Sequence, residues 1–208
     1  MIITYHGVGF VKAQVGDLTV AFSPIGKDSK EKVTRFGADL VLVANNNSRY
    51  NGVDQVSGFN KEPFVIDGPG EYESNSLFIR GVQTTGPNNT MNTAYALNID
   101  GIRVCHLGNL ASGGLTPNAK EAIGVVDVLF VPIAEVGGLD AKEAIKTALS
   151  FEPSIIVPVG YTEAAGETAV KAFLKEAGAD KGQITEKLTI KKKDLEGKEG
   201  EVVVITSF

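Results

Sequence analysis

The sequence contains a single cysteine among its 208 residues and no hydrophobic run long enough to cross a membrane. The lone Cys105 cannot form an internal disulfide, which is typical of a protein in a reducing compartment. The longest apolar stretch, Val125–Ala134, is interrupted by Asp127 and Pro132 and is shorter than the ~20 residues of a transmembrane helix. The N-terminus has no basic segment ahead of an apolar one, so no signal peptide is predicted. We therefore expect a cytoplasmic protein without a membrane partner.

The chain also lacks an excess of positive charge. Its formal net charge is −5 and its pI is near 5.1. The one basic run, Lys191–Lys193, is followed closely by acidic residues between Asp194 and Glu201. A nucleic-acid site needs clustered lysines and arginines without such compensation. We therefore expect no nucleic-acid partner.

Short β-prone segments dominate the first half of the chain. The continuous apolar run Asp39–Ala44 is typical of a strand that is covered on both faces, and Ser29–Phe36 is interpreted as a short helix. The other predicted strands of this half are Met1–Tyr5, Phe10–Val15, Leu18–Phe22, Pro63–Asp67, Glu71–Glu73, Leu77–Arg80, Ala94–Ile99 and Arg103–His106.

Helices alternate with strands in the second half. One predicted helix, Thr116–Ile123, begins with a threonine N-cap and a proline, and a second begins at Asp140 with Glu143 as its capping-box partner. A third is predicted over Glu167–Ala177. The predicted strands are Asp127–Pro132, Ser154–Pro158, Leu188–Lys192 and Glu201–Thr206. Because no linker separates the halves, we expect one α/β (α+β) domain over residues 1–208, built as a four-layer αββα sandwich.

Three predicted strands run into loops rich in glycine and asparagine. Asp39–Ala44 is followed by the loop 45–52, Arg103–His106 by the loop 107–110, and the strand ending at Pro158 by Val159–Tyr161. Loops at strand ends are where an α/β sandwich places functional residues. The sequence therefore predicts a site where these loops meet.

The order of six short segments resembles the metallo-β-lactamase superfamily. Within it, the chain is similar to small zinc-dependent hydrolases related to the ascorbate-phosphate lactonases. The segments are TYHG at 4–7, the strand and loop at 39–52, GPGEYE at 68–73, HLGN at 106–109, DVLFVPI at 127–133 and EPSIIVPVGY at 152–161. The resemblance implies the αββα sandwich and a zinc cofactor. It also implies hydrolysis of a small ester, lactone or phosphate.

Most of the family's metal ligands are replaced in this chain. The family's loop motif His-x-His-x-Asp-His falls, in order, on Asn45, Asn47, Arg49 and Tyr50. Its histidine at a later strand end is kept as His106, whereas the bridging aspartate of that segment becomes Asn109. The remaining ligand positions fall on Val8, Ser23 and Gly160.

These replacements oppose a catalytic metal. Zinc takes about three imidazole, carboxylate or thiolate ligands, and amide oxygens suit calcium or magnesium better. A guanidinium at Arg49, ~4 Å from a dication, would cost on the order of 8 kcal/mol at an effective dielectric constant of 20. We therefore expect no metal ligand set and no cofactor, and zinc follows from the resemblance alone.

Other chemistry at the same place remains open. Arg49, Tyr50 and His106 are a candidate group for binding a small anionic ligand, whereas an ion pair of Arg49 with Glu71 or Glu73 would simply fill the space. Adjacent strand residues point to opposite faces, so Cys105 is expected to be an inert core residue. The residues expected to line the pocket are Asn45, Asn47, Arg49, Tyr50, Glu71, His106, Asn109 and Tyr161.

Three functions follow from these observations. The favoured one is a non-catalytic binding or assembly module, with which a homo-oligomer is compatible. The second is a hydrolase with a metal-dependent or modified site, in which His106 would be the catalytic residue as a general base. The third is a protein that binds a small anion without converting it.

Overall fold

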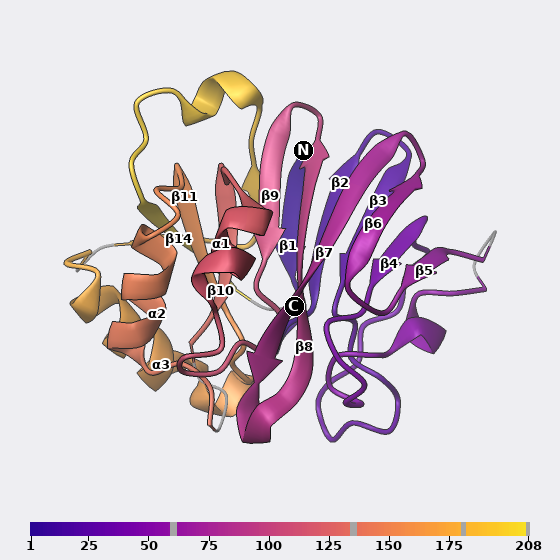
Figure 1. The fold of residues 1–208 in the computed structure, drawn as a ribbon, viewed down its shortest axis with the longest axis horizontal. Coiled ribbons are helices and arrows are strands. Elements are labelled where there is room, and N and C mark those ends of the chain that lie inside the picture. The colour runs from indigo at the N-terminus through magenta and orange to yellow at the C-terminus, as the bar shows by residue number, and fades with distance from the viewer. Residues whose placement is uncertain (59–61, 134–136, 180–181, 207–208) are drawn as a thin grey trace.

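The computed structural model describes residues 1–58, 62–133, 137–179 and 182–206, which form two β-sheets packed face to face (Figure 1). The strands of the first sheet are β1 (Ile2–Tyr5), β2 (Val11–Val15), β3 (Leu18–Phe22), β4 (Leu40–Leu42), β5 (Phe64–Ile66) and β13 (Leu188–Thr189). The strands of the second are β6 (Gly70–Ser74), β7 (Leu77–Gly86), β8 (Thr90–Ile99), β9 (Ile102–His106), β10 (Val128–Pro132), β11 (Ile155–Val159), β12 (Gln183–Thr185) and β14 (Glu201–Ile205).

Both sheets are mixed. The six-stranded sheet has the order β13-β1-β2-β3-β4-β5, in which β3, β4 and β5 run parallel. The eight-stranded sheet has the order β12-β14-β11-β10-β9-β8-β7-β6. Neighbouring strands are parallel among β12, β14, β11, β10 and β9, and they are antiparallel among β9, β8, β7 and β6. The parallel strands bring the carboxyl ends of β9, β10 and β11 to the same edge.

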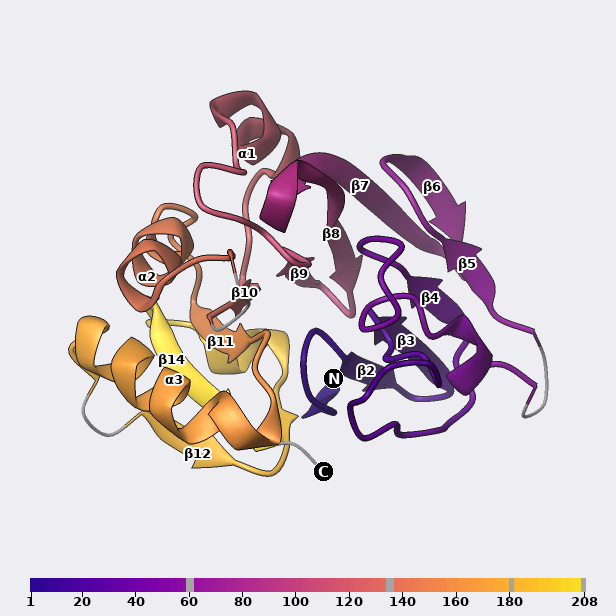
Figure 2. The ribbon, with the colours of Figure 1, turned by 90° about the horizontal axis from the view of Figure 1, so that it is seen from below.

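The helices cover the outer face of the eight-stranded sheet (Figure 2). They are α1 (Pro117–Ile123), α2 (Ala141–Leu149) and α3 (Glu163–Glu176), and the 3-10 turns are η1 (Val53–Gln55), η2 (Pro87–Asn89) and η3 (Lys192–Leu195). The N-caps predicted at Thr116 and Asp140 are confirmed, including the capping box between Asp140 and Glu143. None of the described helices is long and apolar enough to span a membrane.

The predicted sandwich is confirmed by the alternation of side chains along the strands. On β3 and β4, Val20 and Leu40 pack into the core between the sheets, whereas Ala21 and Val41 join a second cluster on the outer face of the six-stranded sheet. The second cluster is covered by the segments 23–39 and 43–56 on either side of β4, which are loop apart from η1. This loop layer carries part of the candidate site.

The prediction of a short helix over Ser29–Phe36 is wrong, because these residues form an irregular segment. A segment of this length is a marginal helix by itself, and it contains the β-branched pair Val33 and Thr34. Its apolar residues Val33 and Phe36 pack on the second cluster, and its Glu31 forms an ion pair with Arg49. Tertiary contacts therefore decide its conformation.

A buried carboxylate ties the last third of the chain to β9. Asp127, with 7% of its side chain exposed, accepts from Arg103 Nη2 at 2.6 Å and from Lys192 Nζ at 2.7 Å. Burial by itself would raise the pKa of Asp127, but the hydrogen bonds from Arg103 and Lys192 lower it to about 2. The carboxylate is therefore ionised at neutral pH and holds η3 against the start of β10.

Candidate functional site

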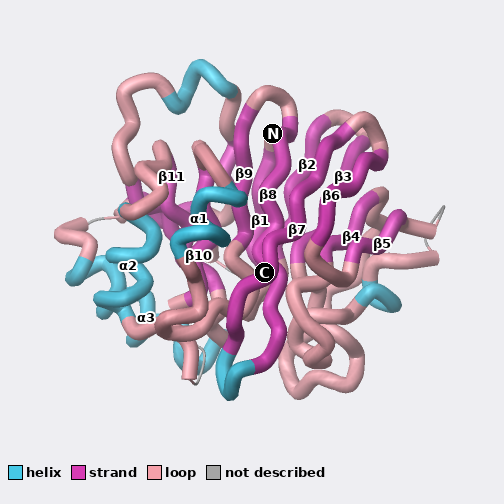
Figure 3. The backbone as a smooth tube through the Cα atoms, in the orientation of Figure 1, coloured by secondary structure: helices cyan, strands magenta, loops and turns pink. Residues whose placement is uncertain are grey.

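A cavity of about 540 Å³ lies where the loop after β4, the turn η2 and the loop after β9 meet. Figure 3 shows η2, in cyan, at the lower tip of the β7–β8 hairpin. Five of the predicted site residues line this cavity: Asn45, Asn47, Arg49, Tyr50 and Asn109. We call this cavity the carboxamide pocket because asparagines from all three segments line it.

Five lining residues were not predicted from the sequence, namely Asn46, Pro87, Asn88, Thr90 and Met91. The last four lie at the turn between β7 and β8, and only the tertiary fold places this hairpin beside the loop after β4. The sequence signal for this turn was the adjacent pair Asn88 and Asn89, because asparagine tolerates the positive φ values that tight turns require. In the structure the two residues have φ values of 55° and 57°.

The asparagines of the first loop also build the loop itself. The Asn45 side-chain oxygen accepts from the Asn47 amide at 3.0 Å, and the Asn47 oxygen accepts from the Arg49 amide at 3.0 Å. Such side chains mimic backbone turns. The Asn51 side-chain amide donates to Asn46 at 2.9 Å and closes the loop. The oxygens of Asn45 and Asn47 are therefore engaged within the loop.

Arg49 is paired, but with neither Glu71 nor Glu73, the two acids considered from the sequence. Its Nη2 lies 3.4 Å from Glu31 Oε1, and both side chains are largely covered, with 29% and 27% exposed. Glu71 instead accepts from Arg80 at 2.8 Å, because the two residues face each other across β6 and β7. The prediction that Glu71 lines the pocket is therefore wrong, and its partner lies on the edge strand pair.

His106 lies at the end of β9 and is 1% exposed. Its Nε2 is 2.8 Å from the Gly9 carbonyl oxygen, and its Nδ1 accepts from the Gly108 amide at 2.9 Å. Because a carbonyl can only accept, this network assigns the proton to Nε2. Burial lowers the pKa of His106 to about 4, although the Gly9 hydrogen bond acts in the opposite direction. The imidazole is therefore neutral at pH 7, and both of its nitrogens are used.

Aromatic rings surround this histidine. The Phe22 ring is stacked on His106 at 5.5 Å, and Phe130 is tilted against it at 5.6 Å. The Tyr50 ring packs against Gly9, since a Cβ added to Gly9 would come within 2.6 Å of that ring. His106 is therefore packed beneath the loop around Gly9 and does not line the carboxamide pocket, contrary to the prediction.

Tyr161 was also predicted to line the pocket, and the structure places it elsewhere. Its hydroxyl donates to the Ile205 carbonyl at 3.2 Å, and its backbone carbonyl accepts from the Val8 amide at 2.9 Å and from the Tyr5 hydroxyl at 2.8 Å. These bonds fasten the N-terminal loop to the end of β11. Tyr161 therefore has a structural position outside the carboxamide pocket.

The three remaining positions of the family's ligand set have unusual backbones. Val8 and Ser23 have φ values of 52° and 46°, which non-glycine residues rarely adopt. Gly160 has φ +82°, and a Cβ there would lie 2.9 Å from the Pro132 Cβ. Within the described residues, no group of three or more His, Cys, Asp and Glu is positioned to hold a metal ion.

Comparison with known families identifies the superfamily to which the chain belongs. A sequence model described as "Beta-lactamase superfamily domain" matches residues 2–160. The chain belongs to the metallo-β-lactamase superfamily. Among curated proteins, none matches it.

Several solved structures share the fold of this chain. A candidate Zn-dependent hydrolase from Thermotoga maritima is 30% identical, with a TM-score of 0.80 over 100% of this chain and 99% of that chain. A candidate metal-dependent hydrolase from Parabacteroides distasonis is 19% identical, with a TM-score of 0.63 over 86% and 90%. The metallo-β-lactamase fold protein YhfI from Bacillus subtilis is 12% identical, with a TM-score of 0.64 over 99% and 96%. This superfamily member thus resembles proteins named as hydrolases.

Proposed function

We propose that this metallo-β-lactamase superfamily member is a cytoplasmic, non-catalytic binding module, whose carboxamide pocket takes a small hydroxylated anion. The observation that carries the proposal is the engagement of both His106 nitrogens, with the Gly9 carbonyl at 2.8 Å and the Gly108 amide at 2.9 Å. A histidine that donates at Nε2 and accepts at Nδ1 has no lone pair left for a metal or for a substrate proton. It is a core residue in this arrangement.

The donor set around His106 does not fit a catalytic zinc. Zinc needs about three imidazole, carboxylate or thiolate ligands and an open position for water. Here the neighbours of the single imidazole are Phe22, Phe130 and the Gly9 backbone. The oxygens of Asn45 and Asn47, at the positions of two family histidines, already accept hydrogen bonds within their loop. These residues therefore do not support a metal-dependent hydrolytic step.

The chemistry of the carboxamide pocket favours an anion that also carries a hydroxyl group. Arg49 supplies a guanidinium, which binds carboxylate or phosphate oxygens through paired hydrogen bonds. Asn109 Oδ1 is buried and has no hydrogen-bond partner among the described residues, so it can accept a hydrogen bond from a ligand hydroxyl. Sugar phosphates and hydroxy acids combine the two groups.

The names of the similar proteins favour a second function, a metal-dependent hydrolase. The 30% identical protein from Thermotoga maritima is a candidate Zn-dependent hydrolase, and it is matched over its whole length. In that case the substrate would be a small ester, lactone or phosphate. The loop around Gly9 would then have to leave His106, since its carbonyl occupies Nε2.

Thermal shift with a panel of sugar phosphates and hydroxy acids tests the proposal. A ligand at ~100 times its Kd adds about 2.7 kcal/mol, which raises the Tm of a chain of this size by roughly 5–10 °C. We expect the shift to be lost in Arg49→Gln and kept in Arg80→Gln, a matched control in which the arginine is also paired with one glutamate.

Three results would contradict the proposal. An equal shift in both arginine variants, or none for any member of the panel, would remove the carboxamide pocket as an anion site. Turnover of a lactone, ester or phosphodiester probe that depends on added zinc would instead establish the hydrolase.

A further inference from the structure

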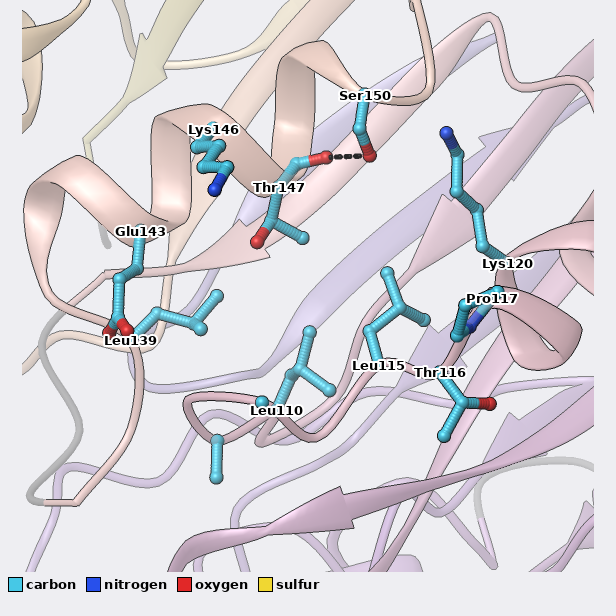
Figure 4. A pocket seen from close by; sticks show the side chains of 12 residues that line it. Leu110, Leu115, Thr116, Pro117, Lys120, Leu139, Glu143, Lys146, Thr147 and Ser150 are labelled. Atoms are coloured by element: carbon cyan, nitrogen blue, oxygen red, sulfur yellow. Dashed lines mark hydrogen bonds between the residues drawn. The ribbon is translucent and has the colours of Figure 1, made fainter.

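A second cavity, of about 500 Å³, lies between α1 and α2 on the outer side of the eight-stranded sheet (Figure 4). Among the described residues it has no lining residue in common with the carboxamide pocket. Its volume falls in the range of small-molecule sites, about 300–1,000 Å³. This cavity, which we call the interhelical pocket, is therefore a candidate binding site separate from the carboxamide pocket.

The floor of the interhelical pocket is apolar. Leu110, Leu115 and Leu139 extend into it from the loops before the two helices, as Figure 4 shows. Leu110 and Leu139 are 1% and 5% exposed, so they are fixed by the core beneath them. Thr147 of α2 adds its side chain from above. An apolar ligand segment would be sheltered from water there.

Two lysines stand on opposite sides of this floor. Lys120 comes from α1 and Lys146 from α2 (Figure 4). The Lys120 ammonium lies 5.8 Å from the centre of the Phe151 ring, which holds it at the rim. In the described part of the chain, neither lysine forms an ion pair. The rim therefore presents two cations that are available to an anion.

Among the described residues that line the interhelical pocket, the one acid does not neutralise these lysines. Glu143 accepts from the Ser112 hydroxyl with Oε1 and from the Asp140 amide, at 3.3 Å, with Oε2. Both carboxylate oxygens are therefore engaged on the side of the helix N-terminus, as the capping box requires. The local charge of the rim stays positive.

We propose that the interhelical pocket binds an amphiphilic carboxylate, with its apolar chain on the leucine floor and its carboxylate between Lys120 and Lys146. A neutral apolar ligand would leave two ammonium groups without a partner. A hydrophilic polyanion would leave Leu110, Leu115 and Leu139 in contact with polar groups. The combination of a single anionic head and a hydrocarbon chain satisfies both parts of the pocket.

Octanoate is the probe, and its Kd is measured by heteronuclear NMR titration of the full chain. We expect shifts in the amides of 110–120 and 139–150, and binding about tenfold weaker for 1-octanol, which lacks the charge. Lys120→Gln with Lys146→Gln should weaken octanoate by at least about tenfold. The matched control, Lys142→Gln with Lys175→Gln, removes two exposed lysines outside the interhelical pocket and should change nothing.

A second variant tests the floor independently of charge. Thr147→Phe would fill the interhelical pocket and should also weaken octanoate by about tenfold or more, with unchanged Tm as the check on folding. Equal binding of octanoate in the wild type and in the lysine variant would overturn the proposal. Amide shifts confined to other surfaces, or no binding at millimolar octanoate, would overturn it as well.

Discussion

His106→Ala is expected to lower the free energy of unfolding by about 3–5 kcal/mol. The substitution removes a ring that is packed between Phe22 and Phe130 and leaves a cavity in the core. It also leaves the Gly9 carbonyl and the Gly108 amide without their partner. Urea unfolding at neutral pH, without added metal, measures the change.

The chain offers a matched control in its second histidine. His6 is partly exposed, hydrogen-bonds Thr4 and packs on Phe10 and Phe36 at the surface of the second cluster. His6→Ala should therefore cost less than half as much as His106→Ala. If His106 were instead a vacant metal ligand, its removal would cost less than about 1 kcal/mol without metal, and zinc would stabilise the wild type but not the variant.

Gly160→His, which restores the last ligand of the family, is expected to destabilise the chain by about 3 kcal/mol or more without creating a metal site. The position has φ +82°, where a side chain is strained, and a Cβ would lie 2.9 Å from the Pro132 Cβ. The backbone of β11 and of the following loop would have to move. Thermal and urea unfolding of the variant measure this loss.

Two alanine substitutions separate strain from crowding. Gly101→Ala carries only the cost of a positive φ, +76°, because nothing lies within 4 Å of its Cβ, so about 1 kcal/mol is expected. Gly160→Ala has a similar φ and the Pro132 contact, so it should cost about 1–2 kcal/mol more. Equal losses would show that the end of β11 can relax, and a stable Gly160→His variant that binds zinc would contradict the account.

Much of the fold could be predicted because periodicity and capping are local. The apolar run at β4, the threonine cap of α1 and the capping box of α2 each have a signature within a few residues. The length of the β7–β8 hairpin and the strand β12 were missed, since these depend on pairing with distant strands. The irregular conformation of 29–36 also depends on distant contacts.

The candidate site could be predicted only in part, for a similar reason. The loops after β4 and β9 converge as expected, although the two strands belong to different sheets, because the sheets pack face to face. Whether a residue that matches a family motif reaches that pocket depends on packing, however. His106 is turned to the Gly9 carbonyl, and Glu71 to Arg80, by contacts that no motif encodes.

Metal content, measured by plasma mass spectrometry on protein purified without chelator or affinity nickel, tests the central proposal most directly. Because both His106 nitrogens are hydrogen-bonded to backbone groups, we predict zinc, iron and manganese far below one equivalent. The stoichiometry should stay low after incubation with excess zinc and desalting. About one equivalent of any of these metals in the wild type, lost in His106→Ala, would contradict the account and make this chain a metal-dependent hydrolase candidate.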